Sequence, residues 1–321
     1  MNIHESSNHR IIESSSHNGF GSICAVIIAY NPGRGFAANF TAIKGQVDKV
    51  IIIDNASGDE TRQVLKNLEK ENKDGLEIIY NNENFGVAKA QNIGIKMALK
   101  EGYDWVMLLD HDSTAMPKMV LEMMNAYFAN PLKNRIGIIA PYIEEQNVQK
   151  NQYGIISFLG ALFKRVPLKG VKYINDILSV TASGSLIKRT LLEEIGLMYE
   201  EFFIDCIDME YCLRAITRKW KIMVAGQAVL KHRIGNKTAH DFFGFKFATS
   251  NHDAARRYSV SRNRLIFWRL YWNKVPALVY YSFLAALFEI FLILSFEGNK
   301  LEKLKNIILG SKDGLVKKIE K

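Results

Sequence analysis

Residues 23–29 read Ile-Cys-Ala-Val-Ile-Ile-Ala, and the turn Tyr30-Asn31-Pro32-Gly33 follows them directly. A continuous apolar run that ends in a turn is typical of a strand buried on both faces, as in a parallel sheet. Three later apolar runs have the same character, and they are Val50–Ile53, Leu76–Tyr80 and Trp105–Leu109. The segment 23–29 therefore predicts the first strand of a mostly parallel sheet.

Helical segments separate these predicted strands. Ser57 and Glu60 fit a capping box, which predicts a helix from there to about Glu71. A second helix is predicted over Gly86–Leu99. Pro117 is placed to open a third, because proline is best tolerated in the first turn of a helix. The alternation predicts right-handed connections around a mostly parallel sheet, with ligands beyond the carboxyl ends of its strands.

The chain beyond residue 130 is less regular. Two strands are predicted, at Ile136–Ile143 and Val180–Ile187. An irregular connection over Lys150–Lys172 is predicted between them. Two helices are expected at Asp208–Arg218 and Tyr258–Tyr271. Two short strands are expected between those helices, at Ile222–Val224 and Ala228–Leu230.

Composition and missing motifs limit the functional class. The 321 residues are 48% hydrophobic, enough for one large α/β domain with an appendage. The net charge of +9 suits a phosphate-rich partner, namely a nucleotide, a nucleic acid or an anionic membrane. The three cysteines form no C-x-x-C pair, which favours reduced, cytoplasmic thiols. Zinc-protease, P-loop, nucleophile-elbow and dinucleotide-binding motifs are all missing.

The two ends of the chain differ from its middle. Residues 1–21 are mostly polar and are expected to be a disordered N-terminal segment, followed by a main domain over 22–270. In the C-terminal segment 271–321, Val275–Phe296 is long enough to span a bilayer. Glu289 near its centre favours a helix that lies on the membrane or on the protein. The lysine-rich tail behind it suits anionic lipid, or is simply solvated.

Two aspartates directly follow the predicted strand Trp105–Leu109, in the sequence Asp110-His111-Asp112. Residues i and i+2 of an extended segment project to the same side, so both carboxylates can share a hard cation that bridges a diphosphate. A solvated acidic turn is the alternative, but the buried strand fixes the direction of both acids. His232, after a later apolar stretch, is either a structural histidine or a further ligand suited to Mn²⁺.

Polar side chains follow other predicted strands in the same way. Those that come just after a strand are Asn31, Asp54, Asn84 and Asp110. Asp54 either caps the helix behind it or accepts hydrogen bonds from a base N–H or a ribose hydroxyl. Gly86 and the helix behind it either form an ordinary turn or offer N–H groups to a phosphate, with Lys89 facing the diphosphate.

Acidic residues are unusually frequent in the apolar stretch Phe202–Arg214. Burying carboxylates costs several kcal/mol unless they are paired or functional. Glu210 and Arg214 are i,i+4 partners, which indicates a structural pair. Asp208 lies at a helix start, where the dipole favours the ionised form. It is either a plain N-cap or a general base for an acceptor hydroxyl.

The order and spacing of these pieces resemble the family-2 inverting glycosyltransferases of the GT-A fold, and among them the bacterial rhamnosyltransferase branch. The matching pieces, within about residues 22–270, are Ala29-Tyr30-Asn31, Ile53-Asp54-Asn55-Ala56-Ser57, Asn84-Phe85-Gly86, Asn92-x-Gly94, Leu109-Asp110-His111-Asp112-Ser113, Ser183-Gly184-Ser185, Phe203 to Glu210, His232 and Tyr258-x-x-x-Arg262-Asn263. The resemblance implies an α/β fold with a Rossmann-like, mostly parallel sheet flanked by helices, and a C-terminal apolar helical appendage.

The resemblance also implies roles for single residues. The donor and nucleotide site would comprise Ala29, Tyr30, Asn31, Asp54, Asn84, Gly86, Lys89, Asn92, Asp110, His111, Asp112 and Arg262. Mg²⁺ or Mn²⁺ would bind Asp110, Asp112 and His232, and Ser183-Gly184 would shape the acceptor side. Asp208 matches the family's catalytic base. Many members have Glu-Asp where this chain has Ile207-Asp208, so Asp205, one helical turn earlier, is the second candidate.

The reaction implied is an in-line displacement that inverts the anomeric carbon. The donor would be dTDP- or UDP-linked, with L-rhamnose from dTDP-rhamnose as the family-level expectation. The acceptor would be a glycan or a polyprenyl-diphosphate-linked glycan of an O-antigen-like surface polysaccharide, met by a cytoplasmic protein peripheral to the inner membrane face. Nucleic acid is not expected as a partner, and the oligomeric state is left open. A nucleotidyltransferase and a non-catalytic nucleotide-sugar or glycan binding protein remain alternatives.

Overall fold

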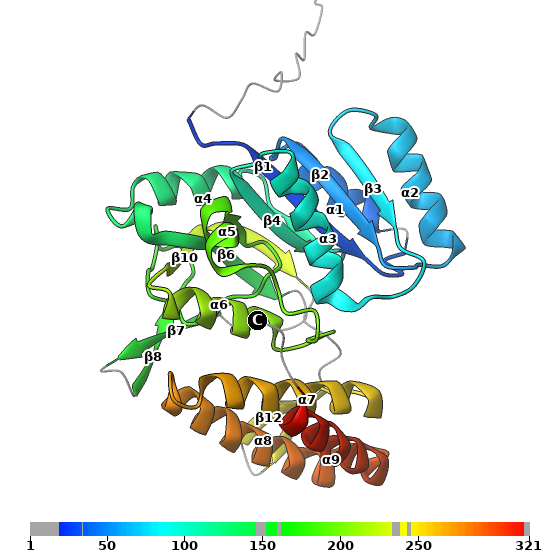
Figure 1. Ribbon diagram of the computed structural model, residues 1–321, viewed down its shortest axis with the longest axis vertical. Coiled ribbons are helices and arrows are strands. Elements are labelled where there is room, and N and C mark those ends of the chain that lie inside the picture. Colours follow the sequence, from blue (N-terminus) through cyan, green and yellow to red (C-terminus); the bar gives the residue numbers. More distant parts are fainter. Residues whose placement is uncertain are drawn as a thin grey trace, which may run out of the picture.

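The computed structural model describes residues 19–317 except 34, 146–151, 159–161, 233–237 and 243–244. Most of the predicted N-terminal segment 1–21 therefore lies outside the described residues. In the described part, helices cover a central sheet, and a layer formed by α7, α8 and α9 lies beside this α/β body (Figure 1). The predicted α/β class with a C-terminal helical appendage is confirmed.

The central sheet has eight strands in the order β3-β2-β1-β4-β9-β6-β10-β5. Their bounds are β1 Ile23–Ala29, β2 Lys49–Asp54, β3 Leu76–Tyr80, β4 Trp105–Asp110, β5 Ser113–Ala115, β6 Ile136–Glu145, β9 Leu186–Lys188 and β10 Lys221–His232. Strands β3, β2, β1 and β4 pair in parallel, as do β6 and β10. Strand β9 is antiparallel to β4 and β6. The ends of β2 and β4 therefore meet at the edge that β1 also reaches.

Alternate residues of β1 enter two separate cores, which is why the whole strand is apolar. One face of the sheet is covered by α1 (Phe36–Lys44), α2 (Asp59–Glu71) and α4 (Met119–Phe128). The other face is covered by α3 (Gly86–Lys100), α5 (Arg189–Ile195) and α6 (Ile207–Thr217). Burial on both faces holds the strand ends, and the polar residues that follow them, in fixed positions.

The predicted strand Val180–Ile187 is wrong over most of its length. Only Leu186–Lys188 is a strand, and Gly184 before it has a φ of +84°. The backbone N–H of Ser185 donates to the carbonyl of Ala182, which closes a turn. Apolar and β-branched residues made this stretch look like a strand, but the left-handed glycine breaks it.

Other boundaries also differ from those expected. The irregular connection Lys150–Lys172 contains a hairpin of β7 (Tyr153–Phe158) and β8 (Leu162–Pro167). The two short strands after α6 are one strand, β10, with a register shift between Ala225 and Val229. The capping box is not formed, because α2 has Gly58 as N-cap and no side-chain cap bond. Pro117 lies before Lys118, the N-cap of α4. The remaining short elements are η1 Lys133–Arg135, β11 Thr238–Phe242 and β12 Phe245–Thr249.

The C-terminal layer consists of α7 (Ala254–Tyr271), α8 (Pro276–Phe296) and α9 (Lys300–Val316). Helix α9 packs so closely on α7 that a Cβ atom on Gly310 would lie 2.2 Å from the carbonyl oxygen of Tyr258. A Cβ atom on Gly314 would lie 2.4 Å from the carbonyl oxygen of Arg262. Both glycines are therefore required by the close approach of the two helix backbones.

Gly310→Ala is expected to lower the free energy of unfolding by about 1–3 kcal/mol, because the added methyl group forces α9 away from α7. Gly298→Ala is the matched control, since nothing lies within 4 Å of a Cβ atom built there. Thermal unfolding of the two variants measures the difference. Equal melting temperatures would show that α9 is not packed against α7 as described.

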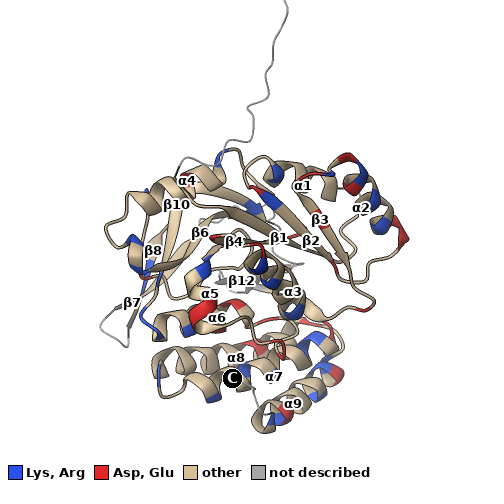
Figure 2. Cartoon of the chain, turned by 45° about the horizontal axis from the view of Figure 1, so that its top comes forward, with Lys and Arg blue, Asp and Glu red and all other residues tan. Residues whose placement is uncertain are grey.

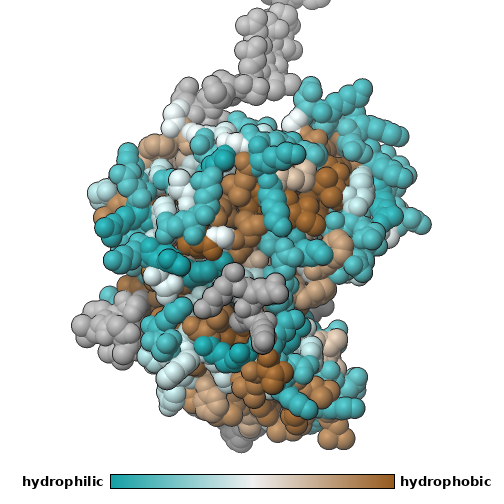
Figure 3. Space-filling model, in the orientation of Figure 1, coloured by the Kyte–Doolittle hydropathy of each residue, from teal (hydrophilic) through white to brown (hydrophobic). Residues whose placement is uncertain are grey.

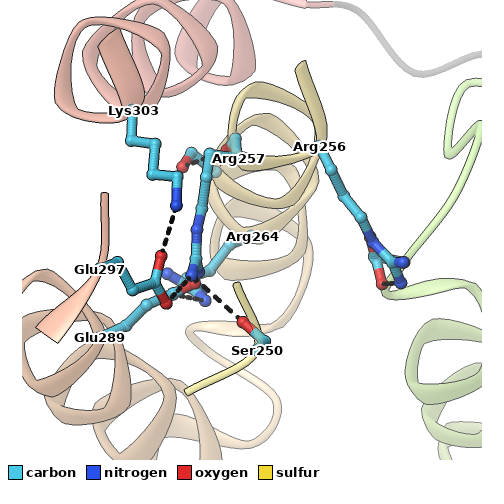
Figure 4. A network of polar contacts seen from close by, with 9 residues as sticks. Ser250, Arg256, Arg257, Arg264, Glu289, Glu297 and Lys303 are labelled. Carbon is cyan, nitrogen blue, oxygen red and sulfur yellow. Dashed lines mark hydrogen bonds and ion pairs between the residues drawn. The ribbon is translucent and has the colours of Figure 1, made fainter. Parts of the chain in front are cut away.

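Of the described residues, only α8 forms a helix long and apolar enough to cross a membrane, and 17% of its most apolar window is buried. Hydrophobic residues cover much of the surface where this layer lies (Figure 3). Glu289, the charge in its middle, faces the protein and pairs with Arg257 and Arg264 of α7 (Figure 4). The carboxylate that argued against a span is thus neutralised by α7, which keeps α8 against the rest of the layer.

Candidate active site

Three predicted metal ligands come together at the end of β4. Asp110 closes β4, Asp112 follows it, and antiparallel pairing of β10 with β5 places His232 opposite Ser113. One ligand atom from each of Asp110, Asp112 and His232 lies within 4.8 Å of the other two. Two carboxylates and an imidazole are a donor set suited to Mn²⁺ or a similar divalent ion.

Two serines hold this group in place from behind. Ser113 Oγ lies 2.8 Å from His232 Nδ1 and 2.7 Å from Ser183 Oγ. Ser183 Oγ also accepts a hydrogen bond of 3.0 Å from the backbone N–H of Asp110. The partners of a ligating histidine fix its ring orientation, so Ser113 belongs to the site, although the sequence analysis assigned no role to this residue of the matching motif. Its position directly after Asp112, at the start of a strand, was the signal available.

Ser183 and Gly184 were expected to shape the acceptor side. Ser183 is buried, and its hydroxyl faces the ligand loop. A Cβ atom on Gly184 would lie 2.8 Å from both Leu230 and Pro141. The hydroxyl of Ser183 therefore supports the backbone of the Asp110–Asp112 loop, and the place of Ser183 and Gly184 on the acceptor side stays a prediction.

Electrostatics couples the three ligands. Burial raises the pKa of Asp110, although the charge of His232 opposes the rise. Burial also acts to raise the pKa of Asp112, but the hydrogen bond and charge of His232 outweigh it, and the pKa of Asp112 falls. For His232, burial favours the neutral ring, yet the bond and charge of Asp112 raise its pKa. The group thus concentrates negative charge that a cation, or a proton on His232, balances.

Asp208 lies in the first turn of α6 and is partly buried. Burial raises its pKa to about 7, against the backbone N–H of Ala182, which donates to its carboxylate. The charge of Asp110 raises this pKa further and that of His232 lowers it. Ala182 precedes Ser183, whose hydroxyl accepts from the N–H of Asp110, so Asp208 lies beside the Asp110 loop. The N-cap of α6 is Cys206, which excludes Asp208 as a plain N-cap. Acids from two distant segments therefore share one site.

Asp205, the second candidate for the base, forms an ion pair with Arg256. Its two carboxylate oxygens accept hydrogen bonds of 3.1 and 3.0 Å from the guanidinium of Arg256. Glu210 pairs with Arg214 in two hydrogen bonds, as the i,i+4 spacing predicted. Of the acids in this stretch, Asp208 is the one that faces the metal-ligand group.

The predicted nucleoside residues gather at the ends of β1 and β2. Asp54 is fully buried, and its Oδ1 accepts a hydrogen bond from the backbone N–H of Ser57. Its Oδ2 has no hydrogen-bond partner among the described residues and lies 3.6 Å from Arg62 Nε. Asn31 ties the first two strand ends together, since its Oδ1 accepts from the N–H of Gly58. A buried carboxylate oxygen without a hydrogen bond is an acceptor that a nucleoside donor can satisfy.

Beside them, Ala29 is buried at the end of β1, and the Tyr30 side chain is 46% exposed. Asn84 Oδ1 accepts from Asn55 Nδ2 and from the N–H of Gly86, which shapes the start of α3. The ammonium group of Lys89 lies 3.8 Å from the centre of the Phe85 ring. The backbone carbonyl of His111 accepts a hydrogen bond from Asn39.

Three residues assigned by resemblance to the donor site contact the segment 198–203, and their donor role stays a prediction. A Cβ atom on Gly86 would lie 2.5 Å from the Phe203 ring, so this glycine permits contact with Phe203. The buried amide of Asn92 donates to the carbonyl of Met198 and accepts from its N–H. Arg262 Nη2 donates to the carbonyl of Glu201. All three hold the chain in front of α6, a role that sequence spacing alone could not reveal.

Comparisons with known proteins agree with this geometry. The family model "Glycosyl transferase family 2" matches residues 24–196. The chain is 29% identical to the dTDP-rhamnosyl transferase RfbF of Shigella flexneri over 305 residues, covering 92% of this chain and 95% of that protein. It is 24% identical to the uncharacterized glycosyltransferase MJ1057 of Methanocaldococcus jannaschii, covering 67% and 71%.

Solved glycosyltransferases share the fold. GalNAc-T7 with UDP, GalNAc and Mn²⁺ aligns at a TM-score of 0.59 and 15% identity over 81% of this chain and 50% of its own. Staphylococcus aureus TarS 1-349 aligns at 0.56 and 13% identity, covering 92% and 81%. The mannosyltransferase PcManGT of Pyrobaculum calidifontis, in complex with GDP-Man and Mn²⁺, aligns at 0.53 and 14% identity, covering 91% and 74%.

Proposed function

The chain belongs to glycosyl transferase family 2, and on that basis we propose that it transfers L-rhamnose from dTDP-rhamnose, with inversion, to a glycan or lipid-linked glycan of a surface polysaccharide. The observation that carries the proposal is the meeting of Asp110, Asp112 and His232 with the partly buried carboxylate of Asp208. The rhamnosyl transferase that matches most of the chain supports the choice of sugar.

Asp208 acts as the general base of this reaction. Its raised pKa suits it to hold the proton of an acceptor hydroxyl at neutral pH. Asp110, Asp112 and His232 would hold Mg²⁺ or Mn²⁺, and the bound ion would supply positive charge to stabilise the leaving diphosphate. A single carboxylate in the base role fits a displacement that inverts the anomeric carbon.

The nucleoside binds at the ends of β1 and β2. Asp54 Oδ2 accepts a hydrogen bond from a base N–H or a ribose hydroxyl, which gives this buried oxygen the hydrogen bond that it lacks. Tyr30 contributes its exposed ring beside it. Removing the Asp54 carboxylate is therefore the simplest change that weakens nucleoside binding and leaves the base and the metal ligands in place.

A panel of nucleotide sugars tests the proposal, with Mg²⁺ or Mn²⁺ present and thermal stabilisation as a second readout. The expected product is dTDP, released from dTDP-L-rhamnose faster than UDP from any UDP-sugar. Release of pyrophosphate would identify a nucleotidyltransferase instead. Stabilisation by donors without release, with a range of glycan acceptors present, would identify a binding protein.

The pH profile of kcat/KM is expected to rise with pH and to level off near or below pH 7. The base must be ionised to accept a proton, and its pKa of about 7 sets the upper limit of the inflection. Bound metal lowers this value through its positive charge. Initial rates from pH 5 to 8.5 at saturating metal measure the profile, and a rate that falls from pH 5 to 7 would exclude Asp208 as the base.

We also propose that the C-terminal layer binds an anionic membrane surface at the cytoplasmic face. Eight large apolar residues of α8 are at least 41% exposed: Tyr280, Tyr281, Phe283, Leu284, Leu287, Phe288, Phe291 and Leu294. In Figure 2 the ribbon of α8 carries almost no charge, whereas α9 carries many lysines. An exposed apolar helix beside lysines matches the charge and polarity of a lipid surface.

The variant Leu284→Gln/Leu287→Gln/Phe291→Gln/Leu294→Gln is expected to bind vesicles with one third phosphatidylglycerol at least about tenfold more weakly, because the apolar area that enters the bilayer is lost. The control Leu121→Gln/Leu132→Gln alters exposed apolar residues outside the layer and should sediment like the wild type. Unchanged sedimentation of the α8 variant would refute membrane binding through this helix.

A further inference from the structure

We propose that Asn263 of α7 is a positioning residue, which holds the turn Ile204–Cys206 and thereby fixes Asp208 in the active site. The inference rests on the proposed role of Asp208 as the base. Asn263 itself does not reach the reacting atoms, because its side chain lies behind the turn.

The turn is strained. Asp205 and Cys206 have φ angles of +66° and +65°, so two adjacent non-glycine residues adopt the left-handed conformation. Such residues cost about 1–3 kcal/mol each and persist only where the surrounding structure holds them. Cys206 is the N-cap of α6 and has no side-chain cap bond. The turn therefore sets the direction in which α6 starts, and with it the position of Asp208 two residues later.

Asn263 is the group that holds this turn. Its side chain is fully buried, and Nδ2 donates to two successive carbonyl oxygens, 2.6 Å to Ile204 and 3.1 Å to Asp205. Arg262 Nε donates to Asn263 Oδ1, which orients the amide. A buried amide with all of these partners specifies one backbone conformation of the turn.

Neighbouring groups complete the contact from both sides. On the α7 side, Arg256 forms two hydrogen bonds with Asp205, and Arg262 donates to the carbonyl of Glu201. On the α3 side, the backbone N–H of Val87 donates to the carbonyl of Phe203 at 2.7 Å. The segment 201–206 is thus held between α3 and α7, and α7 supplies the contacts to the strained residues themselves.

The C-terminal layer in turn holds α7. Arg257, buried in α7, pairs with Glu289 of α8 and, at 2.7 Å, with Glu297 (Figure 4). Lys303 of α9 pairs with the same Glu297 at 2.8 Å. Figure 4 shows Arg256 pointing from α7 away from this cluster. Arg256 contacts the turn, and the next residue, Arg257, contacts the ion-pair cluster of the layer. The layer therefore fixes the position of α7 and, through the turn, that of Asp208.

Asn263→Ala tests the proposal in the full-length protein. We expect kcat to fall about 10²-fold, because a misplaced base loses its alignment with the acceptor. The Kd for Mn²⁺ and for dTDP should stay within twofold, since the residues proposed to bind them lie at the ends of β1, β2, β4 and β10, away from this turn. Asn130→Ala is the matched control, because Asn130 is also buried and hydrogen-bonded but lies outside the site. Its kcat should be that of the wild type.

Arg256→Ala and Arg256→Lys keep the test valid if Asn263→Ala does not fold. Arg256 is 39% exposed, so its loss leaves no buried cavity. Arg256→Ala should lower kcat about tenfold, and Arg256→Lys should restore part of it. A kcat loss in Asn263→Ala no larger than in Asn130→Ala, or normal turnover in Arg256→Ala, would overturn the positioning role. Full activity of Asp208→Asn would instead overturn the proposed base, which separates the two failures.

Discussion

Asp208→Asn is expected to lower kcat by about 10²–10⁴-fold while the affinity for Mn²⁺ and for dTDP stays the same. Asparagine fills the same space but cannot accept the proton of the acceptor hydroxyl. Asp208 faces the Asp110–Asp112–His232 group but is not part of it, so binding of metal and nucleotide does not need its charge. Single-turnover rates, with dTDP and Mn²⁺ titrations beside them, measure both quantities.

Asp74→Asn is the control, because Asp74 is an exposed acid that precedes β3, at the opposite end of the parallel strands from the site. It should leave kcat unchanged. Turnover in Asp208→Asn within a few fold of wild type would remove Asp208 from the base role. Equal loss of dTDP binding would show that its charge serves the donor and not the acceptor.

The same variant should be more stable at neutral pH. The pKa of Asp208 is about 7 in the folded chain, above the usual value of about 3.9 in an unfolded one. As pH rises through this window, the unfolded state loses the proton first, so the folded state is destabilised, and the cost persists above pH 7. Asparagine removes this cost, so the melting temperature should exceed that of wild type at pH 8 and match it near pH 3.5.

Asp112→Asn is expected to abolish metal-dependent turnover, with a loss of about 10³-fold at metal concentrations that saturate the wild type. Asp112 carries the carboxylate whose pKa is lowered beside His232, so it offers an ionised ligand in the physiological range. Chelation with EDTA should remove wild-type activity, and Mn²⁺ or Mg²⁺ should restore it. The Kd for Mn²⁺ should be weakened by the same substitution.

Asp176→Asn is the control for this prediction, because Asp176 is an exposed acid paired with Lys221 outside the site. It should keep both Mn²⁺ binding and turnover. Wild-type activity that survives exhaustive chelation would contradict a metal role for the whole group. Activity lost on chelation but kept in Asp112→Asn would move the metal to other residues.

Much of the fold follows from the apolar runs of the sequence. Ile23–Ala29 and Trp105–Leu109 are strands because helices on both faces of the sheet leave no exposed side. The hairpin of β7 and β8 gave no such signal, since it lies outside the central sheet. Val180–Ile187 resembled a strand, but the left-handed Gly184 turns the chain there. Pairing and backbone conformation at such points depend on distant partners.

The candidate site shows the same division. Asp110 and Asp112 could be predicted because they come at the end of the buried strand β4, and Asp208 because it starts a helix within an apolar stretch rich in acids. Asn92 and Arg262 could not be placed, because their hydrogen bonds reach residues 106 and 61 positions away in the chain. The resemblance grouped Asn92 and Arg262 with the donor site, but only the fold shows which segment they contact.

A crystal structure with Mn²⁺ and dTDP, located by the anomalous signal of manganese, tests most directly whether the two groups of acids form one site. We expect Mn²⁺ between Asp110, Asp112 and His232, with the diphosphate on it and the carboxylate of Asp208 open to the same cavity. Manganese bound elsewhere, or a diphosphate separated from Asp208 by the protein, would contradict the proposed reaction.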